Sequence, residues 1–394
     1  MATAIRDVEL CSPLAAIADL GAYSRCLLVF RWRRRVVGRQ FVSVFSDRLD
    51  TGAIIQAANQ CAVDASYRWL ADTIGYDERD FVGARALTAT VAICTRERPE
   101  DLSRTLGAVT PYIDAGHQIV VVDNAPRTSR TREVVEQFRG VRYVCEPTVG
   151  LNVARNRAMR EASTDLVAFT DDDAIPEAEW LDALIANFGD PRVLCATGLT
   201  LPIELETDAQ ELFEDLSPFG RGFRRRIFDG QHDNPVEVGR VGAGANMALR
   251  RVTIDRVGPF DERLDAGTPT RSGGDHEMFV RILAAGYQIA YDPAAVSRHR
   301  HRRTHDELRD TLHGYGVGVY AMFTGLLLER RELGVVRLAW AWFRSAHLPE
   351  LRRWLLRRPP TPTSPFILAE LRGCLHGPAA WFAARRLRRN ADCR

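Results

Sequence analysis

A repeating pattern of short apolar runs and helical segments, which begins near residue 88, most constrains how this chain can fold. Four runs rich in β-branched residues cover 90–94, 118–122, 141–145 and 166–170, and the helical segments between them cover 99–109, 130–139 and 151–162. Strands that alternate with helices predict βαβ units and a parallel sheet. Ligands of such sheets bind beyond the carboxyl ends of the strands, so the residues after each run are candidates for a site.

Polar residues follow all four predicted strands. The segments are 95–99 (TRERP), 123–124 (DN), 150–156 (GLNVARN) and 171–173 (DDD). A single segment of this kind is typical of a turn or a helix cap. Four of them at one edge of a sheet predict a binding site, and Pro99 favours a helix start that attracts an anion.

The sharpest signal is the run Asp171, Asp172 and Asp173. Three consecutive carboxylates repel one another unless they are solvated or bound to a cation, and Mn²⁺ or Mg²⁺ with oxygen ligands would offset that repulsion. Asp171 and Asp173 project to the same side of an extended segment, so these two can share one metal. The alternative is a solvated loop that caps a helix.

Seven segments, taken in order, resemble the family 2 glycosyltransferases of the GT-A fold over residues 88–305. They are VAICTRERP (91–99), IVVVDN (119–124), GLNVARNRA (150–158), FTDDDAIP (169–176), GAGANMALRR (242–251), GPFDERL (258–264) and GGDHEMFVRIL (273–283). The resemblance implies an α/β fold with a Rossmann-like, mostly parallel sheet and flanking helices. It also implies a nucleotide-diphospho-sugar donor.

The resemblance assigns roles to individual residues of the donor site. It places the base, ribose and diphosphate of the nucleotide against Thr95, Arg98, Asp123, Arg155 and Asp172. Asp171 and Asp173 match the ends of a DxD-like motif, whose metal bridges the diphosphate and acts as a Lewis acid toward the leaving group. His299 fits a place where some GT-A enzymes add a metal ligand, although an exposed basic run is an equal alternative.

A second constellation, GGDHE at 273–277, opens a helical segment. Alignment on Arg281 places Asp275 at the general base of the family and Glu277 at its second acid, while Gly274 replaces the usual preceding Glu. In an inverting mechanism this base removes the proton of the acceptor hydroxyl. A helix N-cap is the structural alternative for Asp275.

Three domains are expected. Residues 1–87 read as a small α+β accessory unit with strands at 26–30 and 41–45 and a helix near 51–74, residues 88–305 as the catalytic domain, and residues 306–394 as a helical, basic extension. Residues 298–394 contain 19 Arg and 8 acids, a net charge of +11, whereas residues 1–297 contain 34 Arg and 43 acids, a net charge of −9.

The basic extension raises the question of a membrane. A last helix near 366–387 carries Trp381 and Phe382 beside an arginine cluster, so it suits either an anionic lipid surface or a solvated cap. No nucleic-acid-binding motif accompanies the charge. The N-terminus shows no secretory pattern, and the longest uncharged stretch of the tail, 314–328, is shorter than the ~20 residues of a spanning helix. We therefore expect a cytoplasmic protein, with a peripheral place at the inner face of the membrane left open.

The predicted function is a metal-dependent, inverting sugar transfer from a nucleotide-diphospho-sugar to an acceptor hydroxyl. Uridine diphosphate is the first expectation for the nucleotide, with thymidine and guanosine diphosphates as alternatives. The expected acceptor is a lipid-linked compound or a small natural product. All 53 basic residues are arginine, which excludes lysine-dependent phosphate binding and argues against a nucleotide-sugar-forming nucleotidyltransferase. That enzyme and a non-catalytic sugar- or lipid-binding protein are the alternatives.

Overall fold

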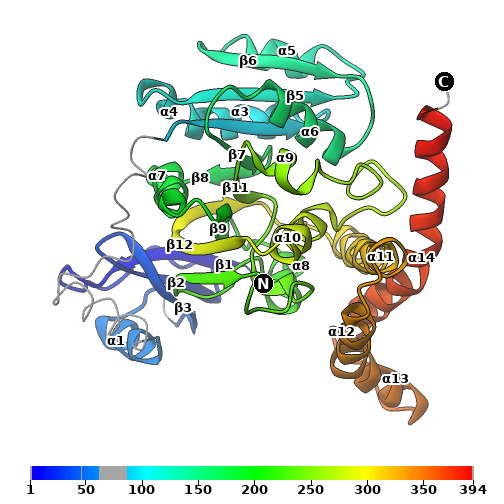
Figure 1. Cartoon of the computed structure of the whole chain (residues 1–394). Helices are drawn as coiled ribbons and strands as arrows, with labels where there is room; N and C mark the ends of the chain where they lie inside the picture. Colours follow the sequence, from blue (N-terminus) through cyan, green and yellow to red (C-terminus); the bar gives the residue numbers. More distant parts are fainter. Residues whose placement is uncertain (1, 46, 62–86, 393–394) are drawn as a thin grey trace.

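The computed structural model describes residues 2–45, 47–61 and 87–392 (Figure 1). Its main feature is a nine-stranded sheet of order β10-β12-β9-β11-β7-β4-β5-β6, with β8 paired to β12. The strands are β4 (Ala89–Thr95), β5 (Gln118–Asn124), β6 (Val141–Glu146), β7 (Leu166–Asp171), β8 (Ala174–Pro176), β9 (Val193–Pro202), β10 (Arg226–Asp229), β11 (Asn246–Arg250) and β12 (Gln288–His299).

The parallel half of the sheet follows the predicted alternation. The four apolar runs form β4, β5, β6 and β7, which pair in parallel, and the predicted helices form α3 (Pro99–Val109), α5 (Arg130–Val135) and α6 (Leu151–Glu161). Both faces of these strands are covered. Val120 and Val122 pack into the core on one face of the sheet, and Ile119 and Val121 pack into the core on the other face.

The second half of the sheet is mixed. Strand β11 runs antiparallel to β7 and to β9, and β12 runs parallel to β9. In the described part of the chain, β8, β10 and β11 oppose the common direction of the other six strands. This confirms the α/β, mostly parallel fold class that the resemblance implied. Between the strands lie α4 (Pro111–Asp114), α7 (Trp180–Ile185), α8 (Asp208–Leu216), α9 (Thr253–Val257) and α10 (Gly274–Ala284).

Strand β12 is twelve residues long and continues through a bulge. Its pairing with β9 jumps between Asp292 and Val296, whose partners on β9 are consecutive residues. Gly198 lies opposite this bulge, where a Cβ atom would lie 2.1 Å from the carbonyl oxygen of Ala295. The absence of a side chain at Gly198 therefore makes room for the bulge, and beyond it β12 reaches His299.

The N-terminal unit is a three-stranded sheet of β1 (Thr3–Glu9), β2 (Arg25–Trp32) and β3 (Arg35–Ser43), with α1 (Thr51–Gln60) beside it. Strand β1 is not among the strands expected from the sequence. Strand β3 begins six residues before the expected strand, because the turn that joins it to β2 consists of only Arg33 and Arg34, both at positive φ. The expected helix beyond 61 lies outside the described residues.

This unit packs against the larger sheet. Leu28 and Phe30 of β2 face α1, whereas Leu27 and Val29 pack against residues of β9 and β12, among them Leu201. The period-2 alternation of a strand thus lets β2 serve two cores. The chain boundary expected at residue 87 stays a prediction.

The C-terminal extension is helical, as expected from the sequence. It consists of α11 (His305–Arg330), α12 (Gly334–Trp342), a π-helical turn (Phe343–His347), α13 (Leu348–Leu355) and α14 (Ser364–Asp392). Helices α11 and α14 lie close together, since a Cβ at Gly316 would lie 2.2 Å from the carbonyl oxygen of Glu370. Among the described residues, no helix combines the length and the apolar character that a bilayer span requires.

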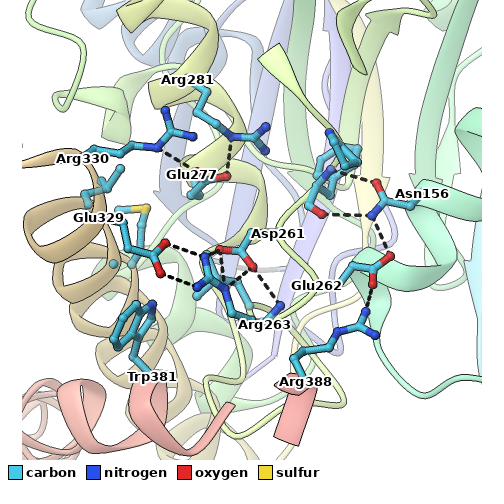
Figure 2. Close-up of a pocket in the computed structure, with 16 residues that line it drawn as sticks. Asn156, Asp261, Glu262, Arg263, Glu277, Arg281, Glu329, Arg330, Trp381 and Arg388 are labelled. Carbon is cyan, nitrogen blue, oxygen red and sulfur yellow. Dashed lines mark hydrogen bonds and ion pairs between the residues drawn. The ribbon is translucent and has the colours of Figure 1, made fainter. Parts of the chain in front are cut away.

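Helix α14 is anchored to the part of the chain that forms the large sheet. Trp381 is only 1% exposed and packs in the main core, with the Arg263 guanidinium 5.6 Å from its ring. Arg263 also pairs with Glu329 of α11 at 2.6 Å, and Arg388 pairs with Glu262 (Figure 2). Trp381 is therefore part of the protein interior and is not available to a lipid surface.

We predict that Gly316→Ala lowers the thermal unfolding midpoint, because the added methyl group collides with backbone of α14 and such overpacking costs roughly 1–3 kcal/mol. Gly107→Ala is the matched control. Gly107 lies on the exposed side of α3 with nothing within 4 Å of its Cβ position, so this change should stabilise the protein by up to about 1 kcal/mol. Equal midpoints for the two variants would contradict the close helix contact.

Candidate functional site

A cleft of about 370 Å³ opens at the carboxyl ends of the parallel strands. Six residues that the sequence pattern singled out line it, namely Thr95, Arg98, Asp171, Asp172, Asp173 and His299. They come from the ends of β4, β7 and β12 and from the start of α3. The fold therefore gathers distant segments at the sheet edge where ligands of parallel sheets bind.

Asp171, Asp173 and His299 form a compact group. Each offers one ligand atom, and these atoms all lie within 4.8 Å of one another. Nε2 of His299 lies 3.0 Å from Oδ1 of Asp173 and 3.6 Å from Oδ2 of Asp171. The pairing of β8 with β12 sets this arrangement, because it places His299 directly opposite Ala174, next to Asp173.

The charges of this group depend on one another. Burial alone would lower the pKa of His299, but the carboxylates of Asp173 and Asp171 raise it to about 10. Burial alone would raise the pKa of Asp173, but His299 and two arginines hold it well below its usual range. Two carboxylates and an imidazole that lie this close together are a donor set that could hold a divalent cation.

Asp172 does not belong to this group, and it contacts β4 and α3 instead. Oγ1 of Thr95 donates to it at 2.7 Å, and Nη1 of Arg98 donates to Asp172 at 3.2 Å and to Asp173 at 2.9 Å. Burial and the negative charge of Asp173 raise the pKa of Asp172 to about 7. Thr95 and Arg98 thus hold the carboxylate run in place, and their contact with a nucleotide stays a prediction.

Asp123 and Arg155 are buried and do not line the cleft. Asp123 accepts a hydrogen bond from the Tyr143 hydroxyl at 2.9 Å, and burial raises the pKa of its carboxyl. Nη1 of Arg155 donates to Asp265 at 2.8 Å. Sequence reasoning missed Asp265, although it stands one residue beyond the GPFDERL segment that the resemblance singled out.

Asp275 stands in the first turn of α10, where its carboxylate is held by backbone. Oδ2 accepts from the N–H of Gly244 at 2.7 Å, and Oδ1 accepts from the N–H of His276 at 2.8 Å. Burial alone would raise the pKa of Asp275, but His276, Arg155 and these N–H donors hold it below its usual value. A Cβ at Gly244 would lie 2.7 Å from Nη2 of Arg155, so a glycine is needed between the two charged groups.

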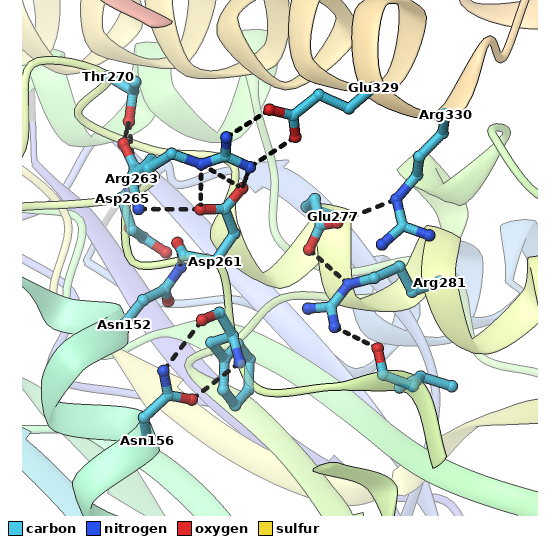
Figure 3. Close-up of polar contacts among 12 residues, drawn as sticks. Asn152, Asn156, Asp261, Arg263, Asp265, Thr270, Glu277, Arg281, Glu329 and Arg330 are labelled. Carbon is cyan, nitrogen blue, oxygen red and sulfur yellow. Dashed lines mark hydrogen bonds and ion pairs between the residues drawn. The ribbon is translucent and has the colours of Figure 1, made fainter. Parts of the chain in front are cut away.

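Glu277, the second acid of the same motif, anchors α10. It accepts from Nε of Arg281 at 2.8 Å and lies 3.9 Å from Nε of Arg330 (Figure 3). Arg281 in turn donates to the carbonyl oxygen of Val257 at 2.6 Å. Arg281 therefore ties α10 to the end of α9, and Glu277 ties it to the end of α11.

Two further residues complete the description of the site. Arg302 lines the cleft 3.8 Å from Oδ2 of Asp173, and the basic run at 298–303 was the available signal for it. Asn246, in the glycine-rich segment, is fully buried and bonds to the Trp180 indole and to the carbonyl oxygens of Leu199 and Ala295. Asn246 therefore holds β9, β11, β12 and α7 together.

Comparison with known proteins finds similarity over the part of the chain that forms most of the large sheet. Residues 90–256 match the family model described as glycosyl transferase family 2. The chain is 29% identical over 229 residues to the pre-mycofactocin glycosyltransferase of Mycobacterium tuberculosis, with 56% of this chain and 44% of that protein covered. It is 25% identical over 227 residues to the glucosyl-dolichyl phosphate glucuronosyltransferase of Haloferax volcanii, with 54% of this chain and 69% of that protein covered.

The matched part of the chain spans less than half of the length of the mycobacterial relative. Among solved structures, the mannosyltransferase PcManGT from Pyrobaculum calidifontis, in complex with GDP-Man and Mn²⁺, is 17% identical with a TM-score of 0.46, and the match covers 86% of each chain. The family match spans β4 to α9, so it includes the aspartate run and the end of β4. The end of β12, which carries His299, lies beyond the match. Residues 90–256, which contain the aspartate run, are therefore similar to the glycosyl transferase family 2.

Proposed function

We propose that this chain transfers a sugar from a nucleotide-diphospho-sugar to an acceptor hydroxyl, with inversion at the anomeric carbon and with a divalent cation. The observation that carries the proposal is the group of Asp171, Asp173 and His299 at the cleft. A diphosphate leaving group gains negative charge as its bond to the sugar breaks, so a fixed cation beside it stabilises the transition state.

The cation would be held by the two outer carboxylates of the run and by the imidazole. A mixed oxygen and nitrogen set suits Mn²⁺ better than Mg²⁺, which prefers oxygen alone. His299 must lose its proton to bind a metal, so its elevated pKa means that cation binding releases a proton. Arg98 and Arg302, which now pair with the carboxylates, have the charge and the position to contact the diphosphate.

Asp275 is the proposed general base. Its low pKa keeps the carboxylate ionised at neutral pH, and the two N–H donors fix its orientation. As the acceptor oxygen bonds to the anomeric carbon, its proton passes to Asp275 and the nucleoside diphosphate leaves from the opposite face of the sugar. Arg155, beside Gly244, adds positive charge at this point.

The proposed donor nucleotide is uridine diphosphate, and the proposed acceptor is lipid-linked or a small natural product. The names of the two relatives, one a pre-mycofactocin and the other a glucosyl-dolichyl phosphate transferase, support both acceptor classes. A screen of nucleotide-sugars by thermal shift in Mn²⁺ would identify the donor. The same assay with EDTA tests the metal.

We predict that Asp173→Asn removes the Mn²⁺-dependent gain in nucleotide affinity and lowers transfer by on the order of 10²–10³-fold, since the metal supplies several kcal/mol to the transition state. Asp182→Asn on the exposed side of α7 is the control and should behave as the parent chain does. Donor hydrolysis is measured for each variant in Mn²⁺ and in EDTA. Full activity of the parent chain in EDTA would contradict the proposal.

We also predict that Asp275→Asn lowers turnover by on the order of 10²–10⁴-fold, because the acceptor hydroxyl loses its proton acceptor. The dissociation constant of the donor, measured by calorimetry, should stay nearly unchanged because the metal group is intact. Loss of donor binding in this variant would show instead that Asp275 holds the donor or the fold.

A further inference from the structure

The end of helix α13 displays apolar side chains to solvent. Trp354, Leu355 and Leu356 are 73%, 74% and 62% exposed, and no residue of α13 is buried. Figure 1 shows this helix at the far lower right of the molecule, beyond α12 and away from both sheets. Contiguous exposed apolar residues of this size mark an interaction site rather than ordinary surface.

Helix α12 also exposes apolar side chains on one face, and it lines a cavity with apolar side chains of another face. Val336 and Trp340, four residues apart, are 55% and 60% exposed. Leu338 and Trp342, also four residues apart, face inward and line a cavity. Residues at this spacing share one face of a helix, so α12 separates solvent from that cavity with apolar side chains on both sides.

Most charged residues around the exposed apolar residues are basic, although Nε of Arg353 lies 3.8 Å from Glu350 of the same helix. Arg352 and Arg353 precede them, Arg357 and Arg358 follow them, and Glu350 is the acidic residue of the helix. Glu350 is occupied, because it accepts a hydrogen bond from the Ser364 hydroxyl at 2.6 Å. Trp and Leu flanked by exposed Arg is the composition of a helix that lies at the surface of an anionic bilayer.

We propose that α12 and α13, which we call the docking arm (residues 334–358), bind the surface of an anionic lipid membrane. The arginines attract the headgroups, and Trp340, Trp354, Leu355 and Leu356 enter the boundary between headgroups and acyl chains. This assignment replaces α14 as the lipid-facing element, since Trp381 is buried and Arg388 is paired within the protein. The arm therefore supplies the membrane contact that the basic extension suggested.

The cavity behind α12 is a candidate binding site for part of a membrane-bound acceptor. It has a volume of about 520 Å³, within the usual range of ligand pockets. Six apolar residues of α10, α11 and α12 line part of it, and segment 226–240, which contributes four charged residues to the lining, forms most of the rest. His276 and Leu283 of α10 both line it, and His276 is the neighbour of Asp275. If the proposed function holds, a membrane-bound arm would present this cavity, beside the proposed base, to the hydrocarbon part of a lipid-linked acceptor.

Vesicle sedimentation of the full chain tests the docking arm without reference to catalysis. The probes are vesicles of phosphatidylcholine alone and vesicles with phosphatidylglycerol added. The triple variant Trp354→Ser, Leu355→Ser, Leu356→Ser should lower binding to the anionic vesicles by on the order of 100-fold. Arg357→Gln with Arg358→Gln should lower it by roughly 30-fold, at about 1 kcal/mol per arginine.

The matched controls lie on α14. One is the triple variant Leu375→Ser, Phe382→Ser, Leu387→Ser, whose parent side chains are also exposed, and the other is Arg385→Gln with Arg386→Gln. Both should bind vesicles as the parent chain does. All arm variants should keep the donor hydrolysis rate of the parent in solution, so a failure of docking and a failure of the proposed chemistry give different results.

Three results would overturn the proposal. The arm variants could pellet as the parent chain does, binding could be independent of phosphatidylglycerol, or the α14 variants could be the ones that lose binding. Light scattering adds a fourth, because a parent dimer that the triple arm variant converts to a monomer, without vesicle binding by the parent, would make the arm a protein interface. Thermal unfolding of each variant confirms that its fold is retained.

Discussion

The burial of Asp172 and Asp173 beside the half-buried Asp171, at the end of β7, is the constraint on which the rest of the site depends. Like charges this close are tolerable in a partly buried position only if positive groups surround them. The fold supplies these groups from three directions, as Arg98 from the start of α3, His299 from the end of β12 and Arg302 from the loop that follows. The site therefore needs residues from the parallel half of the sheet, which supplies Arg98, and from the mixed half, which supplies His299 and Arg302.

Much of the central sheet could be predicted because local and global signals agree there. The β-branched runs are buried on both faces, and Pro99 stands at the first turn of α3 as expected. The strand-end residues at the cleft follow from that alternation. Asp265 and Arg302 could not be predicted in the same way, because their positions depend on loops whose path is set by contacts with distant residues such as Arg155.

The C-terminal helices show a different limit of sequence reasoning. Trp381 and Trp354 both stand among arginines in the sequence, yet one is in the core and the other is in solvent. Composition alone cannot separate the two, because arginine covers an aromatic ring inside the protein, as Arg263 covers Trp381, as readily as it flanks one at a lipid surface. Only the close contact of α11 with α14, which glycines permit, decides which tryptophan is covered.

The bulge in β12 gives the site an unusual sensitivity to chain length. Side chains alternate along a strand, so the addition or loss of one residue between the bulge and His299 would turn the imidazole away from Asp173 without altering any residue of the cleft. Loops elsewhere at this edge can change in length and leave the strand ends in place. In a set of related chains, an insertion between Val296 and His299 would therefore report a change in the ligand set, whereas insertions between β9 and β11 would not.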